Sequence, residues 1–310
     1  MTKIKFIFFG TPEFAKIILE KLIRADFIPT AVVTNPDRPV GRKKVLTPPP
    51  VKSLVVKCQM SNVKCSIEIL QPENLSAIGH TLSAMGPDFG ILAAYGKIIP
   101  KEIIDIFPKG IIVVHPSLLP KYRGATPIQN AILADEKKTG TTLIVMDEKV
   151  DHGKIISNSE FLISKDDNYE TLSKKLAGLS GDLLIETLPK YLSGGIKPQP
   201  QDHSRATYTK KFTGEDGFVD EASLRLATET PSLRKTVSLA ETKNLAKKIW
   251  LKIRALNPEP GTWTLRRGSG QENGRRMKIL AADLNDRKLV LRKIQFEGER
   301  PQALNTKQHE

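Results

Sequence analysis

Short apolar runs alternate with amphipathic stretches over the first 160 residues of the chain. The runs predict strands at residues 4–9, 30–33, 89–94, 111–114 and 142–146. Several are continuous rather than alternating, as strands buried on both faces are. Between them, apolar positions recur at helical spacing, as over Phe14–Ile23. This βαβ rhythm predicts an α/β fold with a doubly wound, mostly parallel sheet and helices on both faces.

The turn after the first apolar run carries signals for the start of a helix. Thr11 is a candidate N-cap, Pro12 suits the first helical position, and Glu13 favours the helix dipole. Gly10 indicates either this helix start or a ligand contact. It lacks the further glycines of a GxGxxG motif, which argues against a nicotinamide or flavin cofactor.

A second region follows a stretch rich in Gly, Pro and Gln. Residues 168–192 predict one more helix of the first domain, with Asn168 as its candidate cap. The aperiodic stretch 193–205 predicts a linker, so we expect a first domain at 1–192 and a second at 206–310. In the second, a polar segment over 221–242 precedes a helix at 245–256 and strands at 262–266, 277–281 and 288–296. A small β-barrel fits this order.

Composition and charge narrow the function classes. No apolar run of the 310 residues approaches the roughly 18 that span a bilayer. The two cysteines, Cys58 and Cys65, make no disulfide framework, so we expect a cytoplasmic protein without a membrane partner. The net charge is +14, and residues 206–310 contribute 21 basic against 13 acidic side chains. Such a basic region favours a nucleic-acid partner, although solubility alone would also explain it.

The sequence offers little support for metal or covalent catalysis. None of the five histidines has a second His or Cys at the spacing of a zinc site. The G-x-S-x-G turn of a serine hydrolase is absent from the sequence. We therefore expect a site without a metal and without a covalent intermediate.

Residues that can transfer protons concentrate in 110–153. His115 follows a buried apolar run, so it lies at the carboxyl end of a strand, where open α/β sheets bind ligands. The stiff loop after it, Pro116–Gly124, suits a pocket for a flat heterocycle. Asp151 follows the next apolar strand, and adjacent strand ends would bring it near His115. A carboxylate beside an imidazole fixes its tautomer and raises its basicity. A purely structural Asp–His hydrogen bond is the alternative.

A basic, proline-stiffened loop follows the second strand at the same edge of the sheet. It runs over Asn35–Lys44 and is long for a βα loop. Positive charge at the ligand edge suits a phosphate backbone, and a solvated loop is the alternative.

These segments together resemble the methionyl-tRNA formyltransferase family, over nearly the whole chain. The matching stretches include Phe9–Phe14, Pro36–Arg42, Ala94–Gly96, His115–Gly124 and Asp151–Gly153. The resemblance implies a Rossmann-like formyltransferase domain and an OB-like second domain that binds tRNA. It implies transfer of a formyl group from 10-formyltetrahydrofolate to the α-amine of methionyl initiator tRNA, by a monomer.

The resemblance also implies roles for individual residues. His115 would transfer protons, with Asp151 as its partner. The folate would contact Tyr95, Gly96, Ser117, Leu118, Leu119 and Pro120. The tRNA acceptor end would contact Arg38, Arg42, Lys43 and Lys44.

One position departs from the family pattern. The family has Asn-x-His at the end of this strand, and its asparagine helps to stabilise the tetrahedral intermediate, whereas this chain has Val113. Two alternatives therefore stay open: a non-catalytic or weakened relative that binds tRNA or folate, and a formyltransferase for another amine, such as a sugar nucleotide. Retention of His115 and Asp151 argues against the first, and the basic loop argues against the second.

Overall fold

The computed structural model describes residues 4–41, 43–61, 66–228, 238–266, 274–285 and 288–304. The chain divides into two compact units. Unit 1 consists of Met1–Pro127, Lys138–Ile163 and Ser173–Thr209. Unit 2 consists of Ile128–Lys137, Ser164–Leu172 and Lys210–Glu310.

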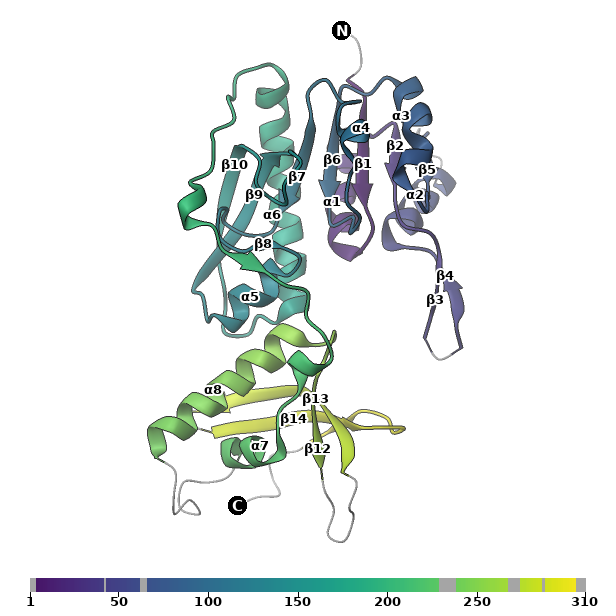
Figure 1. Ribbon diagram of the computed structural model, residues 1–310. Helices are drawn as coiled ribbons and strands as arrows, with labels where there is room; N and C mark the ends of the chain where they lie inside the picture. Colours follow the sequence, from purple (N-terminus) through teal and green to yellow (C-terminus); the bar gives the residue numbers. More distant parts are fainter. Residues whose placement is uncertain are drawn as a thin grey trace. The chain divides into compact units, whose positions relative to one another are not determined.

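Unit 1 is built on a seven-stranded sheet. Its strands are β1 (Phe6–Gly10), β2 (Ala31–Val33), β5 (Glu68–Leu70), β6 (Phe89–Ala93), β7 (Ile111–His115), β9 (Lys138–Val145) and β10 (Ile155–Leu162). Their order across the sheet is β10-β9-β7-β6-β1-β2-β5. Pairs from β7 to β5 are parallel, whereas β9 runs antiparallel to both β7 and β10. The predicted mostly parallel sheet is confirmed (Figure 1).

Helices pack on both faces of this sheet (Figure 1). They are α1 (Glu13–Arg24), α2 (Pro50–Met60), α3 (Gly79–Met85), α4 (Lys101–Ile104) and α6 (Tyr169–Leu192), with a 3-10 turn η1 (Leu75–Ile78). Leu82 of α3 and Ile103 of α4 are buried with Phe9 in one cluster. Lys21 of α1 pairs with Asp182 of α6 at 2.6 Å, which places these two helices side by side.

The turn between β1 and α1 corrects one prediction. Pro12, not Thr11, is the N-cap of α1, and it makes no side-chain capping hydrogen bond. The Thr11 hydroxyl instead accepts from the backbone N–H of Asn35 at 3.3 Å, which ties this turn to the end of β2. A Cβ on Gly10 would lie 2.7 Å from the Cβ of Ala15, so glycine permits the close approach of strand and helix.

Two small sheets complete unit 1. The strands β3 (Arg38–Val40) and β4 (Val45–Thr47) form an antiparallel hairpin, so the predicted basic loop contains regular structure. The strands β8 (Arg123–Gly124) and β11 (Tyr208–Thr209) pair in parallel, next to the 3-10 turn η2 (His203–Arg205). Gln199 of the predicted linker bonds to Ile155 through both backbone groups. The chain is therefore held to unit 1 well beyond residue 192.

Unit 2 contains an antiparallel sheet with helices. Its elements are α5 (Pro127–Leu133), η3 (Glu215–Gly217), α7 (Glu221–Thr228), α8 (Leu239–Leu256), β12 (Thr262–Arg266), β13 (Arg275–Asn285), β14 (Lys288–Phe296) and β15 (Gln302–Ala303). The sheet order is β12-β13-β14-β15. Leu224 of α7 and Ile249 of α8 are buried against Met277 and Leu289 of the sheet. The strands predicted after residue 206 are confirmed, and they pair in an antiparallel sheet.

Helix α6 begins where the sequence predicts, whereas helix α8 begins earlier than predicted. The N-cap predicted for α6 is confirmed, because Asn168 Oδ1 accepts from the backbone N–H of Thr171 at 3.0 Å. Helix α8 begins six residues earlier than predicted, where Ser238 and Glu241 form a capping box. The segment described from the sequence only as polar, over 221–242, contains α7 and this first part of α8. Among the described residues, no helix is long and apolar enough to cross a membrane.

Candidate active site

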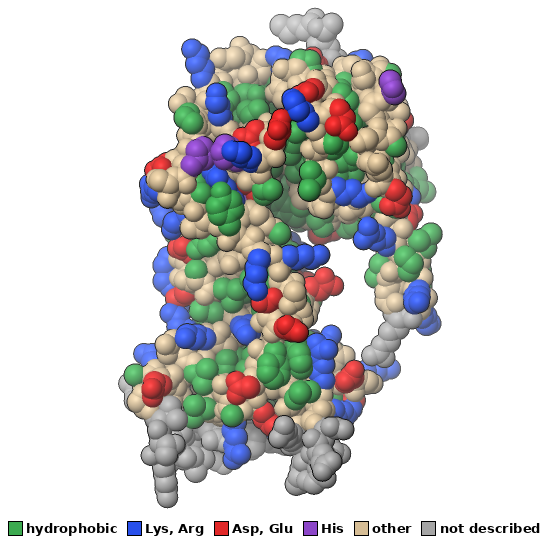
Figure 2. Space-filling view, in the orientation of Figure 1, with side chains coloured by type: hydrophobic (Ala, Val, Ile, Leu, Met, Phe, Trp, Pro, Cys, Tyr) green, Lys and Arg blue, Asp and Glu red, His purple; other side chains and the backbone are tan. Residues whose placement is uncertain are grey.

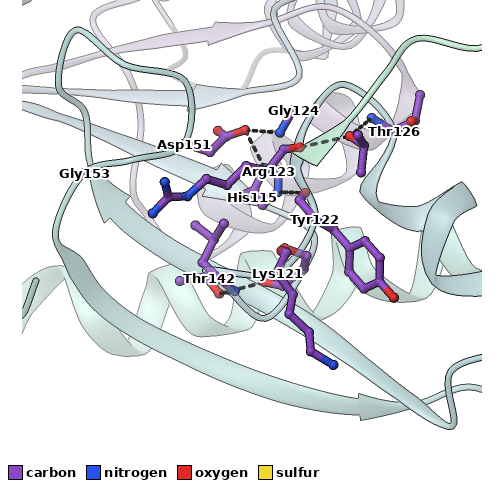
Figure 3. A network of polar contacts seen from close by, with 12 residues as sticks. His115, Lys121, Tyr122, Arg123, Gly124, Thr126, Thr142, Asp151 and Gly153 are labelled. Carbon is purple, nitrogen blue, oxygen red and sulfur yellow. Dashed lines mark hydrogen bonds and ion pairs between the residues drawn. The ribbon is translucent and has the colours of Figure 1, made fainter. Parts of the chain in front are cut away.

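His115 ends β7 in a buried position, with 5% of its surface exposed. Its Nε2 lies 2.9 Å from the carbonyl oxygen of Tyr122. Its Nδ1 lies 3.5 Å from Oδ2 of Asp151 (Figure 3). A carbonyl oxygen only accepts, so Nε2 carries the proton in this arrangement and Nδ1 faces the carboxylate. Both nitrogens of the ring therefore face acceptors.

Asp151 reaches His115 by a route that the sequence did not predict. Val145 near the end of β9 pairs with Ile112, close to the amino end of β7, because the two strands are antiparallel. The predicted meeting of adjacent strand ends is therefore wrong. The connection from β9 to β10, residues 146–154, instead returns along β7 to His115. Gly153 permits this return, since a Cβ there would collide with the carbonyl of Val145.

The Asp151 carboxylate is fixed by a backbone donor as well as by the imidazole. The N–H of Gly124 donates to Oδ2 of Asp151 at 2.7 Å, so one oxygen faces both Gly124 and His115 (Figure 3). Asp151 itself has a φ of 48°, in the left-handed region that is uncommon for residues other than glycine. A strained backbone of this kind persists where neighbouring contacts hold it, and it occurs often at functional sites.

Gly124 is required for this arrangement by both conformation and space. Its φ is 103°, and a Cβ would lie 2.7 Å from the carbonyl oxygen of Thr209 on β11.

Gly124→Ala should lower the free energy of unfolding by about 1–3 kcal/mol and lower kcat, because the displaced N–H no longer holds Asp151. Gly194→Ala is the matched control, since Gly194 has a φ of 81° with no atom within 4 Å. Equal activities of the two variants would contradict this role for Gly124.

Val113 lies two residues before His115, so their side chains are on the same face of β7. It is 6% exposed and packs against Leu119 and Ile144 in a small apolar cluster. Valine offers no polar atom to a substrate there.

The loop after His115 is held by a hydrogen bond within the loop and by two to Thr142 on β9. Ser117 is fully buried, and its hydroxyl donates to the carbonyl of Lys121 at 2.6 Å. The hydroxyl of Thr142 on β9 donates to the carbonyl of Ser117 at 2.6 Å and accepts from the N–H of Leu119 at 3.1 Å. Sequence reasoning missed Thr142, because it lies within an apolar strand. These bonds give the loop over Ser117–Pro120 a fixed shape.

Tyr95 and Gly96 follow β6 at the carboxyl edge of the parallel strands. Tyr95 is buried beside Phe9, and burial raises the pKa of its hydroxyl to about 12. Its carbonyl accepts from Nδ2 of Asn35 at 3.3 Å. Gly96 has a φ of 84°, which suits a sharp turn. Within the described ranges, no three His, Cys, Asp or Glu side chains gather in a way that could hold a metal ion.

Similarity to known proteins identifies the family of this chain. A family model described as formyl transferase matches residues 2–188. The methionyl-tRNA formyltransferase of Dictyoglomus turgidum is 38% identical over 286 residues, which cover 91% of this chain and 80% of that protein. This chain belongs to the methionyl-tRNA formyltransferase family. The Bacillus subtilis enzyme is likewise 38% identical, over 91% of this chain and 78% of its own length. The chain is therefore an enzyme of the formyltransferase class.

Solved structures of formyltransferases share the fold. The methionyl-tRNA formyltransferase from Clostridium thermocellum matches with a TM-score of 0.56 at 16% identity, over 95% of this chain and 99% of that one. A 4-N formyltransferase from Francisella tularensis matches with a TM-score of 0.62 at 18% identity, over 91% and 98%. At such identities the likeness concerns the fold alone.

The basic segment that suggested this family forms the β3–β4 hairpin. Arg38 is exposed on β3, and Lys43 and Lys44 are exposed at the turn, while Arg42 lies outside the described residues. Val40, Val45 and Leu46 are also exposed, so cationic and apolar side chains share this arm (Figure 2).

The root of the hairpin is anchored by Asp37. Its carboxylate lies 2.8 Å from Nζ of Lys52 and accepts from Nε2 of Gln71 at 2.9 Å. These two hydrogen bonds, the one from Gln71 foremost, hold the pKa of Asp37 below its usual value. The arm therefore projects from a fixed base.

Proposed function

We propose that this enzyme transfers a formyl group from 10-formyltetrahydrofolate to the α-amine of methionine on the initiator tRNA. The proposal rests on buried His115 at the end of β7, paired with the partly buried Asp151, in a chain of the methionyl-tRNA formyltransferase family. The fixed loop over Ser117–Pro120, together with Tyr95 and Gly96, would line the folate site. A sugar 3N-formyl transferase with a similar fold was crystallised in the presence of dTdp and 5-N-formyl-THF.

The pair suits the chemistry of this transfer. Attack of the amine nitrogen on the formyl carbon forms a C–N bond and a tetrahedral oxyanion. The bond from that carbon to the folate nitrogen then breaks. One proton must leave the amine, and one must reach the departing folate nitrogen. We propose that His115 carries this proton and that Asp151 orients the ring and stabilises its charged form.

The acceptor is the part of the proposal that needs a direct test. We expect formylation of charged initiator methionyl-tRNA and none of an amino-sugar nucleotide, with 10-formyltetrahydrofolate as the donor. Folate binding without transfer to either acceptor would favour a non-catalytic relative. Transfer to the amino sugar alone would favour the other alternative. The basic hairpin and the positive charge of residues 206–310 favour the tRNA.

We propose that the β3–β4 hairpin contacts phosphates of the tRNA acceptor end. Replacing Arg42, Lys43 and Lys44 by alanine should weaken tRNA use and leave folate binding unchanged. Each lost phosphate contact should reduce the slope of log affinity against log salt by about 0.7–0.9, so the triple variant should lose about 2–3 in slope. Filter binding over a range of salt concentrations measures this slope.

A matched control separates local contacts from net charge. Lys57, Lys174 and Lys197 are exposed elsewhere in unit 1, and replacing them removes the same three charges. This control should keep most of the slope. Equal slopes in the two triple variants would reduce the hairpin to a solvated arm.

A further inference from the structure

A buried arginine that pairs with no carboxylate among the described residues lies beside the Asp151 loop. Arg123 is 1% exposed. Its guanidinium donates to Oε1 of Gln201 through Nη2 at 2.6 Å and Nε at 3.2 Å. Its other partners are Nδ1 of His203 at 2.9 Å and the hydroxyl of Tyr208 at 3.2 Å. All these acceptors are neutral groups. Burying a cation among neutral partners costs free energy of folding, so we expect Arg123 to have a function that outweighs this cost.

His203 can serve as an acceptor because its ring is held in the neutral form. It stacks on His152 with ring centroids 4.1 Å apart, and this contact removes water from one face. Desolvation and the nearby charges of His152, Arg123 and Lys149 lower the pKa of His203, although Asp147 opposes the shift. A neutral ring keeps the lone pair on Nδ1 for Arg123.

Arg123 determines which way the amide of Gln201 points. A guanidinium only donates, so the oxygen of the amide must face Arg123 and its NH2 group must face away. That group donates to the carbonyl of Asp151 at 2.9 Å and to the carbonyl of Gly153 at 2.8 Å. Both hydrogens of the Gln201 amide are therefore used on the loop that carries Asp151.

The two ends of Asp151 are thus held from one short segment. The side chain of Arg123 acts through Gln201 on the backbone carbonyl of Asp151. The next residue, Gly124, donates its N–H to the carboxylate of Asp151. Gln201 is 6% exposed, so water does not compete freely for these bonds. The contacts also help to hold the left-handed backbone of Asp151.

We propose that Gln201, oriented by Arg123, is a positioning residue that holds the Asp151 carboxylate against His115. The proposal rests on the proposed function of this pair in formyl transfer. Gln201 lies in the segment 193–205, whose composition indicated only a linker. Its contribution should appear in kcat rather than in substrate binding, because its amide bonds to Arg123 and to the carbonyls of Asp151 and Gly153.

Gln201→Glu tests the proposal sharply. The new carboxylate keeps an acceptor for Arg123 and adds an ion pair, which offsets part of the stability lost with the two donors. It loses both donors to the loop and faces two carbonyl oxygens. We expect kcat for formyl transfer to fall about 10- to 100-fold, the scale of a misplacement of about 1 Å, while both KM values stay within about twofold. Gln199→Glu is the matched control, because Gln199 is exposed and its amide donates only to the carbonyl of Lys197.

A double variant separates positioning from general structure. In the Asp151→Asn background, Gln201→Glu should change the single-turnover rate by less than about twofold, because its effect passes through Asp151. A kcat of Gln201→Glu equal to that of the control, or the same fold-loss in both backgrounds, would overturn the proposal. If Gln201→Glu unfolds, Gln201→Met keeps the length without either polar end and is held to the same criteria. Failure of the unchanged enzyme to formylate charged tRNA would reject the proposed function instead.

Discussion

Alanine in place of His115 is expected to abolish measurable formyl transfer, a loss of at least about 10²–10⁴-fold in kcat. The ring is the proton carrier in the proposed reaction, and Asp151 lies 3.5 Å from its Nδ1. Asp151→Asn should act in the same direction, because an amide orients the ring wrongly and does not stabilise its charge. Steady-state kinetics with saturating folate and charged tRNA measure both losses.

Two controls keep this result interpretable. His80 is exposed on α3, and His80→Ala should retain full activity. Folate binding and the unfolding transition of His115→Ala should also persist, which excludes general misfolding as the cause of the loss. A His115→Ala protein with the turnover of the unchanged enzyme would remove the catalytic assignment.

Asparagine in place of Val113 is expected to raise kcat by at least about tenfold, with little change in folate affinity. An oxyanion donor typically contributes about 2.7–4 kcal/mol, or 10²–10³ in rate. We set the gain lower because a water molecule or a backbone N–H can substitute in part. The donor matters most once charge develops on the formyl oxygen, so the gain belongs to the transition state rather than to binding.

The apolar packing around Val113 determines how much Val113→Asn lowers the free energy of unfolding. Its neighbours Leu119 and Ile144 are apolar, so an unpaired amide there should lower the free energy of unfolding by about 1–3 kcal/mol. Val113→Ala is the control, because it makes room without adding a donor and should not raise kcat. A folded Val113→Asn enzyme that binds folate and is no faster would show that another group already stabilises the oxyanion.

The fold could be predicted where burial was continuous. Apolar runs such as Phe6–Phe9 and Ile111–Val114 belong to strands covered on both faces, so their composition alone indicates a parallel sheet. The direction of β9 could not be predicted, because an antiparallel strand buried between two neighbouring strands has the same composition. The start of α8 was missed because the polar residues Glu241–Asn244 interrupt the helical period of apolar positions.

In the site, the nearness of two side chains could be predicted, whereas the backbone contacts that fix them could not. The proximity of His115 and Asp151 was expected from their order along the chain and is observed, although the route of the loop was not. The carbonyl of Tyr122 and the N–H of Gly124 could not be predicted, because backbone groups leave no signature in residue type. Gln201 was passed over because its segment has the composition of a linker, while its burial depends on contacts with residues some 50 and 80 positions away.

In the proposed reaction a formyl group passes directly from folate to the amine of charged initiator tRNA, while His115 carries the proton between the two nitrogens. The most direct measurement follows a labelled formyl group from 10-formyltetrahydrofolate in a single turnover, with the unchanged enzyme and His115→Ala side by side. We expect one labelled formyl-methionyl-tRNA for each tetrahydrofolate that the unchanged enzyme releases, and none above background with His115→Ala. Folate bound by both proteins with no label transferred by either would contradict it.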